Sequence, residues 1–176
     1  MGYQETFNSL RSVTWEEVDA ASLDVTGFVV SGAGDDDVAL APPGVARTAT
    51  ALMTGNVDVW TVTITGTRAG VVIDDDLTVT GGGGAVQSVV AFDTITNVAW
   101  ADQVTSGDLD IAWANGFGLP ARIAHASCVL LRFLDGVIDS GGAVRAASGN
   151  EPNGTIEPGS FTGYGTLQAL FYTSAY

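Results

Sequence analysis

The sequence has no lysine, and its six basic residues are all arginines. Against them stand 20 acidic residues, so the formal net charge is −14 at pH 7. A chain this acidic repels the phosphates of nucleic acids and of anionic membranes. We therefore expect neither a nucleic-acid partner nor a membrane partner.

Cysteine and histidine are nearly absent, since Cys128 and His125 occur once each. One cysteine excludes an internal disulfide and any multi-cysteine metal site. Cys128 lies in an apolar run, which favours a buried structural thiol over a nucleophile. His125 has Ser127 as its nearest serine, but proximity in sequence does not give the geometry of a triad. We interpret His125 as structural and expect no enzyme activity, no catalytic residue and no cofactor.

Long hydrophobic runs are also missing: no stretch approaches the about 18 apolar residues that a membrane-spanning helix needs. Met1–Glu5 shows neither the basic nor the apolar pattern of a secretory signal. We therefore expect neither a signal peptide nor a membrane span.

Short apolar runs separated by glycine-rich turns follow from about Val25 onward and predict β-strands. The segment Asp58–Ile64 alternates, with Trp60, Val62 and Ile64 on one face. Its valines and threonines suit a strand because β-branched side chains fit a pleated surface.

Two further patterns predict turns between strands. Asp135-Gly136, a dipeptide favoured in two-residue hairpins, separates Cys128–Leu134 from Val137-Ile138. Within Val89–Trp100 the apolar alternation shifts phase near Asp93-Thr94, which predicts a bulge or bend. In total the sequence predicts eight to ten strands, which is typical of an all-β, β-sandwich or jelly-roll-like domain.

The first residues differ from the rest. Thr14 and Glu17 have the spacing of a capping box, which predicts one short helix over Trp15–Ser22. Before it, large apolar residues interrupt a polar segment, which is either an arm that packs on a partner or a strand lying along the domain. We interpret it as an arm, so the expected division is an arm and short helix over residues 1–24 and one β-sandwich over 25–176. The expected partner contacts are Tyr3, Phe7, Leu10 and Trp15.

Two acidic clusters, Asp35–Asp37 and Asp74–Asp76, supply the oxygen ligands that calcium prefers. Neither has the spacing of an EF-hand loop, and three consecutive carboxylates on an extended chain cannot all face one ion. We interpret both as solvated turn residues and predict no metal site. The tryptophans could stack on sugars, but three of them fall at core positions of strands, which favours packing; the four are Trp15, Trp60, Trp100 and Trp113.

Over residues 45 to 176 the chain resembles a group of small virion proteins of tailed bacteriophages. In that group a TVTGT strand, an FxTVTSV strand and a GLP loop recur in this order. The first forty residues lie outside the resemblance, and the chain departs from the group's pattern at Arg68–Gly70 and Asp74–Asp76. The segments with the resemblance are Trp60–Thr67, Ala91–Val98, Gly116–Pro120, Gly154–Pro158 and Leu167–Tyr172.

The resemblance implies a capsid decoration (cement) protein, which would stabilise the expanded head by bridging subunits of the major capsid protein. It also implies a homotrimer on the outer surface of the virion, made in the host cytoplasm. Two other readings stay open: another virion component, such as a tail-tube, head–tail adaptor or fibre-associated protein, and a carbohydrate-binding β-sandwich.

Overall fold

The computed structural model describes residues 9–18, 26–30, 32–40, 45–55, 58–101, 106–149, 151–159 and 165–174. These residues form antiparallel strands and one 3₁₀ helix, η1 (Ala126–Cys128), so the predicted all-β, sandwich-like fold is confirmed. The described part of the chain contains no helix long and apolar enough to cross a membrane.

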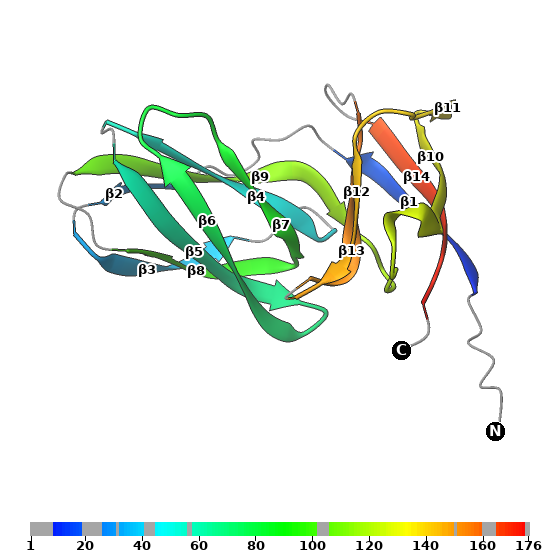
Figure 1. Cartoon of the computed structure of the whole chain (residues 1–176), viewed down its shortest axis with the longest axis horizontal. Helices are drawn as coiled ribbons and strands as arrows, with labels where there is room; N and C mark the ends of the chain where they lie inside the picture. The colour runs from blue at the N-terminus through cyan, green and yellow to red at the C-terminus, as the bar shows by residue number, and fades with distance from the viewer. Residues whose placement is uncertain are drawn as a thin grey trace.

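The strands form three sheets (Figure 1). Sheet C has the order β3 (Gly34–Leu40), β8 (Thr94–Trp100), β5 (Val59–Arg68), β6 (Val71–Thr80). Sheet B has the order β12 (Ala143–Ser148), β13 (Glu151–Glu157), β9 (Gly107–Gly118), β4 (Arg47–Thr54), β7 (Val86–Phe92), with β2 (Thr26–Val30) also paired to β9. Sheet A has the order β1 (Leu10–Val18), β14 (Gly165–Tyr172), β10 (Val129–Leu134), β11 (Val137–Ile138).

The first hydrophobic core lies between sheet C and the β2, β4, β7 and β9 strands of sheet B. Trp60, Val62 and Ile64 are fully buried in it, as the alternation of β5 predicts. The alternate threonines of β5 face the other side of sheet C, because successive side chains of a strand point to opposite faces.

A second hydrophobic core lies between sheet A and the β12–β13 end of sheet B. Strand β9 belongs to both: Leu109 and Trp113 are in the first core and Phe117 is in the second. Figure 1 shows the β12–β13 hairpin standing between the first core and sheet A. The chain therefore has two cores that share one sheet, where the sequence predicted one sandwich.

The predicted helix is wrong over Trp15–Val18, which is the end of strand β1. Strand β1 pairs with β14, with Thr14 opposite Gln168 and Trp15 opposite Leu167. A capping interaction contributes only about 1 kcal/mol, whereas the strand buries Trp15 in the second core. Residues 19–25, where the helix was expected to end and the domain boundary to fall, lie outside the described residues.

The predicted arm is likewise a strand over Leu10–Val18, in agreement with the alternative of a strand lying along the domain. The first and last described segments lie side by side, because the Thr173 N–H donates to the Ser9 carbonyl at 3.0 Å. Sheet A thus joins the two ends of the chain.

Both predicted turns are confirmed. Asp135 and Gly136 connect β10 to β11 with φ angles of 51° and 78°, which a two-residue type I′ turn requires. Asp93 is a bend between β7 and β8, and the chain crosses there from sheet B to sheet C. Position 66 on β5 lies close to this bend and requires glycine, because a Cβ atom there would overlap the Thr94 carbonyl.

Candidate functional site

The structure separates the four expected partner contacts. Tyr3 and Phe7 lie outside the described residues. Leu10 is 52% exposed at the start of β1. Trp15 is only 4% exposed and its ring centroid lies 6.0 Å from that of Phe117. Trp15 is therefore a core residue, and its expected role as a surface contact is corrected.

His125 and Cys128 do not form a reactive pair. His125 is exposed at the start of η1, and in the described part of the chain its imidazole has no hydrogen-bond partner. Cys128 is partly buried and packs against the second core, which agrees with a structural thiol. The side chain of Ser127 is exposed. These positions supply no oriented base for a nucleophile.

The two acidic clusters are strand residues, not the turn residues that the sequence predicted. Asp35–Asp37 lies on β3 and Asp74–Asp76 on β6, the two outer strands of sheet C. Two strands lie between the clusters, so they do not converge on one ion. Over the described residues, no group of three or more acidic, histidine or cysteine side chains could hold a metal.

The position of these clusters indicates a different role. An unpaired strand edge invites pairing with another chain, and charged side chains suppress it. Asn97 of the neighbouring strand β8 donates its amide Nδ2 to Asp35 Oδ2 at 3.5 Å and to Asp37 Oδ1 at 3.4 Å. These contacts hold the two carboxylates on the outer face of the sheet, where they keep other chains away.

Asp75 differs from its neighbours because it faces the interior side of β6. Its Oδ2 accepts hydrogen bonds from the Val89 N–H at 2.7 Å and the Val90 N–H at 3.3 Å, so it connects sheet C to strand β7. Burial raises the pKa of the Asp75 carboxyl, while the two N–H donors act in the opposite direction.

This shift predicts a pH dependence. Because the pKa of Asp75 is raised in the folded state, protonation favours folding. The free energy of unfolding of the wild type, relative to Asp75→Asn, should rise as the pH falls through the raised pKa and level off below about 3.9, the ordinary aspartate value. Urea denaturation at a series of pH values measures it. Asp36→Asn, on the opposite edge of the sheet, controls for the change of net charge, and a relative stability that falls with decreasing pH would contradict the assignment.

A buried ion pair joins the two cores. Arg68, at the end of β5, and Glu151, at the start of β13, are 6% and 2% exposed. The Arg68 Nε atom lies 3.7 Å from Glu151 Oε1, and the Arg68 Nη2 donates to the Leu119 carbonyl at 2.6 Å. Gly118 leaves room for the guanidinium, because a Cβ atom there would overlap it. We call Arg68, Glu151 and their partners the junction cluster.

Glu151 also accepts three backbone N–H groups. Its Oε2 accepts from Ala91 of β7 at 2.8 Å, and its Oε1 accepts from Asn153 and Gly154 at 3.1 and 3.0 Å. Asp93, 3.4 Å from Arg68 Nη1, completes the cluster. The three segments Ala91–Val98, Gly116–Pro120 and Gly154–Pro158, which the sequence analysis singled out separately, therefore meet at this point.

Arg47 occupies a neighbouring position on β4 and is also buried. Its Nε donates to the Ala114 carbonyl at 3.0 Å, and its Cζ lies 4.9 Å from the centroid of the Phe117 ring. Both buried arginines thus contact the end of β9 and the residues after it, where the first core meets the second. These contacts indicate a structural role for both arginines in fixing the two cores to each other.

All four tryptophans belong to the cores. Trp15, Trp60 and Trp113 are buried, and Trp100 is partly buried against the first core. The packing role predicted for the three tryptophans at core positions of strands is confirmed for Trp60, Trp100 and Trp113. Because a sugar can stack only on an exposed ring, the tryptophans do not support the carbohydrate-binding reading.

An exposed apolar surface lies on sheet A, on the face opposite the second core. Leu10 and Tyr172 are directly opposite each other in the register, as are Leu131 and Leu170, and Phe133 and Ile138. Directly opposite residues share a face, and so do residues two apart on one strand. These six side chains therefore lie together, and we call the surface the outer face of sheet A.

The sequence did not predict this surface. The run Val129–Leu134 shows no clean alternation, so the sequence does not tell which of its side chains face a core. In the structure β10 contributes apolar side chains to both faces of sheet A, but only one face has a core against it. The available signal was the absence of alternation in Val129–Leu134, which indicates apolar side chains on both faces of the strand.

Comparison of the chain with models of protein families, with curated proteins and with solved structures found no match.

Proposed function

We propose that this protein is a non-enzymatic structural component of a tailed-phage virion that decorates the capsid. In this proposal it sits as a homotrimer on the outer surface of the expanded head and bridges subunits of the major capsid protein. The link to phages comes from the sequence resemblance of residues 45 to 176. The sandwich-like fold agrees with what that resemblance implies.

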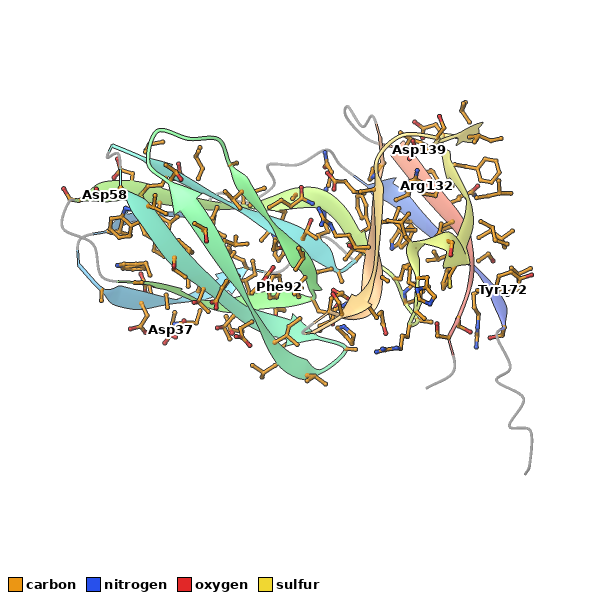
Figure 2. The ribbon with its side chains drawn as sticks, viewed as in Figure 1. Asp37, Asp58, Phe92, Arg132, Asp139 and Tyr172 are labelled. Carbon is orange, nitrogen blue, oxygen red and sulfur yellow. The ribbon has the colours of Figure 1, made fainter. Side chains whose placement is uncertain are left out.

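The observation that supports the proposal most is the uneven distribution of charge between the two ends of the molecule. The outer face of sheet C presents Asp35, Asp37, Asp74 and Asp76 beside threonines of β5. The sheet A end contains every arginine that keeps exposed surface: Arg11, Arg122, Arg132 and Arg145. Figure 2 shows Asp37 and Asp58 at one end of the molecule and Tyr172 at the other.

A molecule with two such ends suits a decorating role. The acidic end remains hydrated and repels other particles, which keeps a densely coated shell soluble. The apolar, less acidic end is suited to contacts with other subunits. The junction cluster fixes the two ends to each other, and a rigid bridge is what a cement protein needs in order to hold the subunits of the expanded shell together.

Co-sedimentation tests the proposal. The purified protein is mixed with expanded, undecorated heads and, as the control, with unexpanded precursor heads from the same phage, and bound copies are counted after pelleting. We expect saturable binding to expanded heads only, near one trimer per three-fold site, with greater resistance of the heads to heat. Binding to neither kind of head, together with rings or tubes formed by the free protein, would instead indicate a tail component.

A further inference from the structure

The outer face of sheet A carries no charge on any of its described side chains. Besides the six apolar residues, it contains Ser12 and Thr14 of β1 and Thr166 and Gln168 of β14. Four of the apolar side chains, Leu10, Leu131, Ile138 and Tyr172, are between 40% and 62% exposed. In a chain with 20 acidic residues, an apolar sheet face whose described side chains carry no charge is a candidate contact surface.

We propose that copies of this chain contact one another through the outer face of sheet A. Two molecules of net charge −14 repel each other, so contact between them is least unfavourable where neither presents a carboxylate. The outer face of sheet C would bring the carboxylates of Asp35, Asp37, Asp74 and Asp76 against the same groups of a second copy. Of the two outer sheet faces, only that of sheet A allows self-contact without this repulsion, and it also removes apolar surface from water.

The two sides of this face differ in shape. At the β10–β11 edge of this face lies a groove of about 260 Å³, whose lining includes Leu131 and Ile138 of the outer face and, toward the core side, Arg132, Asp139 and Val144. The β1–β14 side presents Leu10 and the Tyr172 ring, at the end of the molecule in Figure 2. Contact between unlike sides of neighbouring copies is heterologous, and heterologous contacts close into rings such as a trimer. The inference deepens the homotrimer part of the proposed function and does not depend on capsid binding.

Mass measurement in solution tests the inference, by light scattering after size exclusion and by sedimentation velocity over a range of concentrations. The variants are Leu131→Asp and Ile138→Asp; Val72→Asp, an exposed valine of sheet C, is the matched control. We expect the wild type and Val72→Asp to have three times the 18.0 kDa chain mass. The two sheet A variants should dissociate, with a dissociation constant raised about tenfold or more. Circular dichroism checks that both variants fold, as expected for substitutions of exposed side chains.

Each outcome decides the matter. If the wild type is a dimer and only the sheet A variants are single chains, the result supports the contact face and contradicts the trimer. A wild type that stays a single chain at every concentration, or an assembly that neither sheet A variant weakens, overturns the inference. If the wild type is a single chain and Leu131→Asp loses head binding in the co-sedimentation assay, the face docks on the shell and not on a second copy. Failure of the wild type to bind heads contradicts the proposed function alone.

Discussion

Replacing Glu151 with alanine should lower the free energy of unfolding by about 3–5 kcal/mol, the usual cost of removing one partner of a buried ion pair. The substitution removes the buried anion beside the Arg68 guanidinium and leaves only the more exposed Asp93 carboxylate, at 3.4 Å from Nη1. It also removes the acceptor of three backbone N–H groups, those of Ala91, Asn153 and Gly154. Each buried donor left without a partner adds to the cost.

Three further variants show whether the cost arises from the junction cluster. Glu157→Ala, on the same strand but partly exposed, should cost far less. Glu151→Gln keeps one acceptor oxygen and should fall between the two. The double variant Arg68→Met/Glu151→Leu should be less destabilised than the sum of its single variants, because it leaves no unpaired charge. Urea denaturation followed by tryptophan fluorescence gives the values. Equal costs for Glu151→Ala and Glu157→Ala would contradict the role of the cluster.

Replacing Trp15 with alanine should also be severely destabilising, by about 3–5 kcal/mol, as for other buried tryptophans. Trp15 is 4% exposed and packs in the second core against Phe117. The loss would leave a cavity between sheet A and the end of β9. It would also weaken the pairing of β1 with β14, which joins the two ends of the chain.

At protein concentrations where the chain is a single copy, Leu10→Ala is the matched control, because Leu10 lies on the same strand but points to the outer face of sheet A. It should change the free energy of unfolding by about 0.5 kcal/mol or less, as is usual for exposed positions. Urea denaturation followed by far-ultraviolet circular dichroism suits both variants, since one removes a tryptophan. Similar small effects of both would mean that β1 does not belong to the core.

Features set by neighbouring residues could be predicted from the sequence. The alternation of Asp58–Ile64 correctly gave the buried face of β5, because side chains two apart share a face whatever the strand pairs with. The Asp135-Gly136 turn followed from the positive φ angles that this dipeptide tolerates. The bend at Asp93 followed from the change of phase on either side of it.

Features that depend on distant pairing could not be predicted. The choice between helix and strand at Trp15 depends on β14, whose paired Leu167 is far away in the sequence. The acidic clusters seemed suited to turns because sequence alone does not tell which strands are at a sheet edge. The junction cluster was missed for the same reason, since Arg68 and Glu151 are brought together only by the pairing of β13 with β9.

The most direct test of the decoration role is an electron cryo-microscopy map of expanded heads incubated with the protein. The account predicts added density on the outer surface at three-fold positions, with three copies that meet through sheet A and direct the acidic face of sheet C toward solvent. An outer surface identical to that of undecorated heads, under conditions where the protein is folded and in excess, would contradict it.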